Sequence, residues 1–194
     1  MKIIKIRLLV LGLCLSVGAF AATITENTTG PTILGTNAYV GQSFTTPGGG
    51  PWNNITVNFA TTAGTPVALG TLYLFTAAYS GTPAALSGAG AFATSVSIVS
   101  NQWTFASGVS LASSTLYFFY SDALFGANAI GGSASNPYAG GDNYYTFSST
   151  TAFSLNAGAD ARFNVSGTSS AVPEPATYAT LAAGMLLVGY LRKR

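Results

Sequence analysis

The sequence is poor in the residues on which most enzymes and metal sites depend. It has no histidine, and its one cysteine, Cys14, lies in an apolar stretch near the N-terminus. A serine nucleophile would therefore need a carboxylate as its base, which is a rare arrangement. Zinc, copper and non-haem iron sites usually draw on histidine or cysteine, so we predict no cofactor and no transition metal. With no second cysteine to form a disulfide, the stability of the domain must come from its core.

Charge is also scarce and is concentrated at the two ends. Charged residues make up 6% of the 194 residues, whereas an average protein has about 25%. Three cations lie within the first seven residues, and three more are the last three residues. Between them, the single cation Arg162 stands against five acids, which leaves a net charge of −4. Nucleic acid binding needs clustered Lys and Arg, so no nucleic acid partner is predicted.

The N-terminus has the pattern of a secretory signal peptide, residues 1–21. A basic start is followed by an apolar run, Leu8 to Phe20, and by the small-x-small sequence Ala19-Phe20-Ala21. We expect the secretion machinery to export the chain and signal peptidase to cleave it after Ala21. The alternative is an uncleaved anchor, but the run is short against the roughly 20 residues that a membrane helix needs.

The C-terminal residues 171–194 have the pattern of a membrane segment. Residues 176–191 are uncharged and predict a transmembrane helix, which Pro173 and Pro175 cannot enter and therefore precede. The basic end, Arg192, Lys193 and Arg194, is expected to stay cytoplasmic by the positive-inside rule, with the rest of the chain across the membrane. The alternative is a helix that packs on the domain, although a buried soluble helix rarely stops at three cations.

The motif Val172-Pro173-Glu174-Pro175, followed by an apolar helix and a basic cluster, resembles the PEP-CTERM sorting domain. The resemblance covers about 23 residues. It implies recognition of the motif by an exosortase-like membrane enzyme, in a Gram-negative bacterium that makes exopolysaccharide. It also implies transit through the inner membrane, followed by removal of the helix and release to the cell surface or extracellular matrix.

Residues 22–170 are predicted to form one exported all-β domain. Asn54 to Phe59 alternate polar and apolar residues, as a half-buried strand does. Glycine- and proline-rich turns separate such runs. The expected strands are Tyr39–Thr45, Asn54–Phe59, Thr71–Thr76, Ser95–Val99, Gln102–Phe105, Leu116–Ser121, Tyr144–Phe147 and Ala161–Val165. This pattern favours an antiparallel β-sandwich, jelly-roll-like, and the short run Ala84 to Phe92 is expected to be a loop.

Two of these strands are apolar on both faces. Successive side chains of a strand point to opposite faces, so in Leu72 to Phe75 and Tyr117 to Tyr120 alternate rings must point away from the core. Either a loop covers this outer face, for which Asp122 to Asp142 is the candidate, or the face is exposed and suited to stacking against sugars.

The second possibility supplies the candidate glycan contacts, which are Tyr73, Trp103, Tyr120 and Tyr145. For both tryptophans, Trp52 and Trp103, a place in the core is favoured over a place in a binding surface. Asp142 and Asn143 follow two glycines and are a weak calcium candidate, with an Asx turn as the favoured alternative. A glycosidase needs only two carboxylates, and the domain offers Asp122, Asp142, Asp160 and Glu26. Plainer roles are a turn for Asp142, a strand end for Asp122, and a strand entry or a pair with Arg162 for Asp160.

The domain also resembles the choice-of-anchor family of exported bacterial β-domains. The matching segments include Gly41 to Thr45, Leu111 to Tyr120, Asn136 to Gly141 and Asp160 to Val165. That family implies no particular activity. The predicted function is therefore a non-catalytic surface or matrix protein associated with exopolysaccharide or biofilm. The alternatives are a carbohydrate-binding adhesin that uses an exposed aromatic face and, more distantly, a carboxylate-dependent glycan hydrolase.

Overall fold

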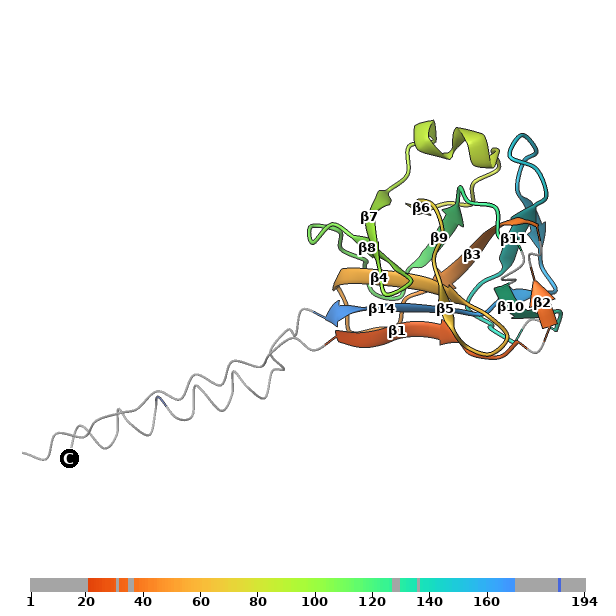
Figure 1. Ribbon diagram of the computed structural model, residues 1–194. Helices are drawn as coiled ribbons and strands as arrows, with labels where there is room; N and C mark the ends of the chain where they lie inside the picture. The colour runs from red at the N-terminus through yellow and green to blue at the C-terminus, as the bar shows by residue number, and fades with distance from the viewer. Residues whose placement is uncertain are drawn as a thin grey trace, which may run out of the picture.

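The computed structural model describes residues 21–30, 32–34, 37–126, 130–135, 137–169 and 185. These residues form an all-β, antiparallel structure (Figure 1). The strands are β1 (Ala21–Asn27), β2 (Thr32–Leu34), β3 (Tyr39–Thr45), β4 (Trp52–Ala60), β5 (Pro66–Val67), β6 (Leu72–Phe75), β7 (Ala93–Val99), β8 (Gln102–Phe105), β9 (Leu116–Ser121), β10 (Ile130–Ser133), β11 (Asn143–Thr146), β12 (Ser154–Asn156), β13 (Asp160–Ala161) and β14 (Phe163–Ser169). A short 3-10 helix, η1 (Pro83–Gly88), lies between β6 and β7.

One large sheet contains most of the strands. Its order is β1-β14-β4-β8-β7-β6-β9-β3-β11-β12, with β5 paired to β4, and a smaller sheet has the order β13-β10-β2. The sheet curls so that its two halves face each other (Figure 1). A single apolar cluster accordingly takes Val57 and Val165 from one half, and Phe44 and Leu72 from the other.

The alternation in β4 predicts correctly which side chains face the core. Ile55, Val57 and Phe59 are buried with at most 1% of their surface exposed, while Asn54 and Thr56 point outward. Asn58 lies on the same outward face but is only 4% exposed. The predicted bounds of β3, β8 and β9 agree with the structure. The predicted strand Ala161–Val165 is instead divided between β13 of the small sheet and β14 of the large sheet. The chain passes from one sheet to the other at Arg162, whose N donates to Gly131 O and whose carbonyl oxygen accepts from Ala60 N.

Aromatic rings fill the centre of the main core. Phe59 meets Trp103 and Phe125 edge to face, with ring centroids 5.8 and 5.5 Å apart. Its ring also packs against Phe119 from the other half of the sheet, at 5.3 Å. Both tryptophans are buried, as predicted, so their area contributes to the core.

A second apolar cluster lies on the outer face of β6 and β9. Alternate residues of these strands divide between the two clusters: Leu72, Leu74 and Phe119 join the main core, while Tyr73 and Tyr120 join the second. This division confirms that both faces of these strands are buried. The second cluster consists of Tyr73, Phe75, Leu86, Phe118, Tyr120 and Phe153, with Tyr39, Tyr79, Ala89, Ala91 and Tyr144 packed against it.

The segment that covers most of this outer face is not the predicted one. Leu86 of η1 is buried against the aromatic rings of this face, so the run expected to be a plain loop contains a 3-10 helix. Two backbone hydrogen bonds, from Ala84 N to Ser149 O and from Phe153 N to Gly81 O, tie the cover to a second loop. Of the predicted cover, Asp122 to Asp142, Phe125 belongs to the main core, while Asp122 and Asp142 reach only the margins of the aromatic face.

The predicted signal peptide (1–21) and the predicted tail (171–194) lie outside the described residues, except for Ala21 and Met185. In the part of the chain that the structure describes, no helix has the length and apolar character needed to cross a membrane.

Candidate functional site

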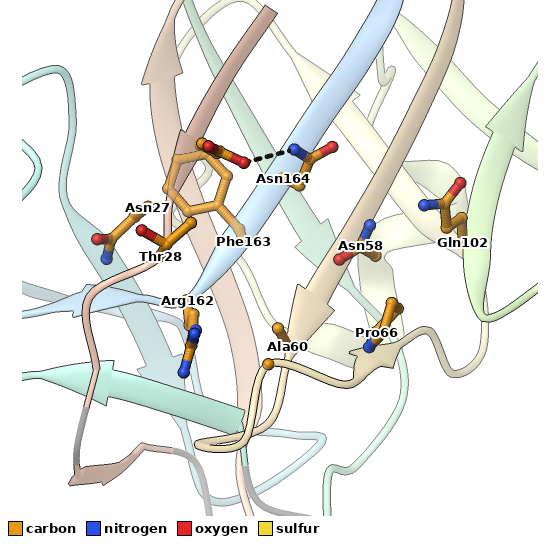
Figure 2. A pocket seen from close by; sticks show the side chains of 11 residues that line it. Asn27, Thr28, Asn58, Ala60, Pro66, Gln102, Arg162, Phe163 and Asn164 are labelled. Carbon is orange, nitrogen blue, oxygen red and sulfur yellow. Dashed lines mark hydrogen bonds between the residues drawn. The ribbon is translucent and has the colours of Figure 1, made fainter. Parts of the chain in front are cut away.

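A polar groove crosses the outer face of β1, β14 and β4, with a volume of about 280 Å³ (Figure 2). Strand register places its side chains in a row. Asn164 of β14 pairs with Glu26 of β1 on one side and with Asn58 of β4 on the other. Residues paired across neighbouring strands point to the same face, so these three polar groups lie side by side. Gln102 of β8 extends the groove beyond β4.

The groove holds one carboxylate and one guanidinium, both engaged by the protein. Asn164 Nδ2 donates a hydrogen bond of 3.0 Å to Glu26 Oε2. Arg162 Nη1 donates a bond of 2.6 Å to the carbonyl oxygen of Thr62. Gly64 lies beside this guanidinium with a φ of +85°, and a Cβ atom there would approach Arg162 Nη2 to 3.2 Å. A glycine is therefore suited to both the backbone conformation and the close approach.

Asp160 lies in a buried network, where the sequence predicted a strand-entry cap or a partner of Arg162. Its side chain is fully buried and accepts hydrogen bonds from Tyr138 N at 2.9 Å and from Gln42 Nε2 at 3.0 Å. Gln42 Oε1 in turn accepts a bond of 2.9 Å from Ala161 N. Burial raises the pKa of Asp160, although the hydrogen bonds from Tyr138 and Gln42 oppose the shift. This network joins β3 of the large sheet to β13 of the small one, so its role is structural.

The chemistry of the groove suits hydrogen bonding to a ligand. Its amide side chains, Asn58, Gln102 and Asn164, can each donate and accept. A carbohydrate presents the same two kinds of group through its hydroxyls. In the described ranges, no group of three or more His, Cys, Asp or Glu side chains is placed to hold a metal ion.

Three of the four predicted glycan contacts are not accessible to a ligand. Trp103 and Tyr120 have no exposed surface, and Tyr73 is 7% exposed. Trp103 Nε1 donates to Gly70 O at 3.0 Å, and Tyr73 OH donates to Asp122 Oδ2 at 3.3 Å. The structure instead places these three rings in the two apolar clusters. Tyr145 is half-buried, and its ring meets the exposed Phe147 at 5.2 Å.

The weak calcium candidate also has another role. Asn143 is buried, and its Nδ2 donates a hydrogen bond of 3.0 Å to the carbonyl oxygen of Gly41 on β3. The side chain thus fixes the start of β11 against its neighbour, instead of forming the expected Asx turn. Asp142, which precedes it, is half-buried. The sorting motif Val172–Pro175 and the cations Arg192, Lys193 and Arg194 lie outside the described residues.

The groove residues Asn58, Gln102 and Asn164 were not predicted from the sequence. The outward position of Asn58 follows from the alternation in β4, but outward polar residues are common on any sheet. Only the pairing of β4 with β14, more than 100 residues away in the chain, brings the amides together. No local pattern encodes that pairing.

Comparisons with protein-family models, with curated proteins and with solved structures find no match to this chain. The chemistry of the described residues and the pattern of the two ends are therefore the basis for any functional proposal.

Proposed function

We propose that this chain is an exported, non-catalytic protein of the cell surface or extracellular matrix that associates with exopolysaccharide. The observation that carries the proposal is the open polar groove on β1, β14 and β4, lined by amides rather than by charge clusters. A hydrated, mostly uncharged polymer offers hydroxyl and ether oxygens, and amide groups can satisfy both. The fold proposed with this function is a jelly-roll-like sandwich, in which the curled sheet packs its two halves across one core.

The same proposal includes delivery by the two ends. A leader (1–21) takes the chain through general secretion, and the tail (171–194) holds it at the inner membrane by a helix (176–191) until an exosortase-like enzyme acts at Val172–Pro175. The support is the order of motif, apolar run and basic end in the sequence. The nearly uncharged domain (22–170) is then released outside the cell of a Gram-negative bacterium.

The described carboxylates support a non-catalytic function. Asp122 accepts hydrogen bonds from Thr71 N at 2.7 Å and from Tyr73 OH, which fixes the start of β6. Asp160 and Glu26 are engaged as described above. No observation favours the glycan hydrolase, whereas a cleft that contains Asp142 and an accessible tyrosine favours a carbohydrate-binding adhesin as the second candidate.

The delivery is tested by fractionating cells that produce the full chain. Replacing Pro173, Glu174 and Pro175 with alanine is expected to leave the full-length protein in the inner membrane, because the extended segment that the enzyme would bind is lost. The matched control replaces Thr177 and Thr180, just beyond the motif, with alanine and is expected to be processed and released normally. Unchanged processing of the triple-alanine variant would contradict sorting, and a cytosolic chain that keeps its leader would contradict export.

A further inference from the structure

A second cleft, of about 320 Å³, opens at the margin of the covered aromatic face. Its walls come from three neighbouring strands: Ser43 and Thr45 of β3, Phe118 of β9 and Tyr144 of β11. We call it the Tyr144 cleft. Its volume falls at the small end of the range for ligand sites, roughly 300–1,000 Å³.

The loop before β11 forms the floor and is held rigidly. Ser43 N donates to Asp142 O at 2.9 Å, and Asp142 N donates to Ser43 Oγ at 2.7 Å. Gly141 passes so close to Ser43 that a Cβ atom there would collide with the backbone of Ser43. Glycine therefore lets the loop lie flat on β3, and the position of Asp142 is fixed by its own main chain.

The ring of Tyr144 is fixed by its neighbours. It meets Phe118 edge to face at 6.0 Å and Tyr120 at 5.5 Å. Desolvation by burial raises the pKa of the Tyr144 hydroxyl, with Asp142 adding to the shift, so this hydroxyl stays neutral and can both donate and accept. In the described part of the chain it has no hydrogen-bond partner, which leaves it available to a ligand.

The charge in the cleft selects among ligands. Among the described residues that line it, Asp142 is the one charged side chain, and none is Lys or Arg. An ionised carboxylate is a strong acceptor for ligand hydroxyl groups. It repels an anionic sugar such as a uronate. A single carboxylate falls short of the six to eight oxygen ligands that calcium takes, so a cation alone fits poorly.

We propose that the Tyr144 cleft binds a neutral sugar unit of a polysaccharide, with the Tyr144 ring against the apolar face of the sugar and Asp142 accepting hydrogen bonds from its hydroxyls. A rigid aromatic ring offers contact area at low entropic cost. Thr45, whose Oγ1 donates to Gly140 O at 2.9 Å, has lone pairs left to accept a further bond. This inference rests on the proposed association with polysaccharide and names the chemical class of the sugar.

The test measures retardation of the full chain in native gels that contain a polysaccharide. Three neutral polymers (a glucan, a galactan and a mannan) are compared with anionic polygalacturonate. We expect at least one neutral polymer to retard the protein and polygalacturonate to have much less effect. Tyr144→Ala and Asp142→Asn are each expected to weaken the binding by about tenfold or more.

Two further variants keep the test decisive. Tyr145→Ala changes the adjacent half-buried tyrosine on the opposite face and should leave retardation unchanged. Tyr144→Phe keeps the ring packing, so a weakened but measurable affinity with an unchanged unfolding midpoint separates binding from folding. The proposal is overturned if no neutral polymer retards the protein, if polygalacturonate does so equally well, or if folded Tyr144→Ala binds normally.

Failure of this inference is distinguishable from failure of the proposed function. A chain that a neutral polymer retards equally well before and after Tyr144→Ala refutes the Tyr144 cleft alone, because the polar groove would then account for the binding. A chain that binds no neutral polymer at all refutes the association with neutral polysaccharide and leaves the delivery standing. A chain that binds a neutral polymer but stays in the cytosol refutes the delivery alone.

Discussion

The two outer faces of the curled sheet differ in the chemistry of their outward side chains and in whether another segment covers them. On the β1, β14 and β4 face, outward side chains such as Asn164 and Thr56 are polar, and the face lies open as a groove. On the β6 and β9 face, the outward side chains Tyr73, Phe118 and Tyr120 are aromatic, and η1 covers them. Strand geometry is the same in both. The comparison shows that side-chain chemistry decides whether a face needs a cover.

The difference also explains how the sheet can meet water with so few charged side chains. Open faces of soluble sheets usually carry many charged residues, whereas this one has amides and hydroxyls, with Glu26 and Arg162 at the groove. The covered face removes its aromatic area from water and gains hydrophobic stabilisation from it. The Tyr144 cleft lies where the cover ends, so it is the place where aromatic surface and solvent meet.

The largest expected effect comes from the covered face. Tyr120→Ala removes a fully buried ring that contacts Phe75, Tyr79 and Phe153, so it should lower the free energy of unfolding by about 3–5 kcal/mol. The matched change on the open face, Asn164→Ala, should alter it by less than about 0.5 kcal/mol. Urea denaturation of the purified protein measures both. Equal losses would break the comparison.

A milder variant separates the ring from its hydroxyl. Tyr120 OH accepts a hydrogen bond of 3.2 Å from Tyr79 N. Tyr79 lies in the segment that leads from β6 to η1, the helix that covers this face. Tyr120→Phe keeps the packing and should lower the free energy of unfolding by only about 1 kcal/mol. A loss as large as that of Tyr120→Ala would show that the hydrogen bond, and not the ring, holds the cover in place.

The sequence predicts the strands better than it predicts what lies on them. The alternation of Ile55, Val57 and Phe59 is a local signal, and it gives the position and facing of β4. The doubly apolar run Tyr117 to Tyr120 shows that a cover is needed, but the choice of cover depends on contacts between distant segments. Leu86 has no special feature in a run of small residues, and only the tertiary structure places it in one cluster with Tyr120.

The same limit applies to the site. Tyr144 and Tyr145 are adjacent, and the sequence shows only that they point to opposite faces. The structure places Tyr144 in the cleft because β11 pairs with β3, which brings Asp142 against Ser43. The predicted contacts Tyr73 and Trp103 were chosen for aromatic chemistry, and in a core this rich in rings such chemistry is mainly used for packing.

An intermediate effect on the free energy of unfolding is expected from Asp160. Its polar side chain is buried, unlike the polar groups of the open face. Its pKa is raised, chiefly by desolvation, so the native state favours the protonated form more than the unfolded state does. The contribution of Asp160 is therefore complete below the ordinary pKa of an aspartate, about 3.9. This contribution to stability decreases as the pH rises through the raised pKa, and it stays constant at still higher pH.

Asp160→Asn removes this titration. The difference in free energy of unfolding between the wild type and Asp160→Asn should therefore shift against the wild type as the pH rises from about 3 to 7. Urea denaturation at several pH values measures this difference. A constant difference would show that Asp160 ionises in the folded protein as readily as in the unfolded one.

The smallest expected effect concerns the groove itself. Glu26 is exposed and accepts one hydrogen bond from Asn164, which the amide oxygen of a glutamine side chain can also accept. Glu26→Gln should therefore change the free energy of unfolding by less than about 0.5 kcal/mol. Removing this negative charge leaves Arg162 as the only charge among the described residues that line the groove. Retardation by polygalacturonate should then increase by about twofold, because exposed charge interactions are weak.

Neutral polymers provide the contrast in the same gels. Their retardation of the Glu26→Gln protein should equal that of the wild type, since Glu26 does not line the Tyr144 cleft. A loss of neutral binding would show that the polymer contacts the groove at Glu26. The polar groove would then recognise the polymer without the Tyr144 cleft, and the aromatic face would contribute to stability alone.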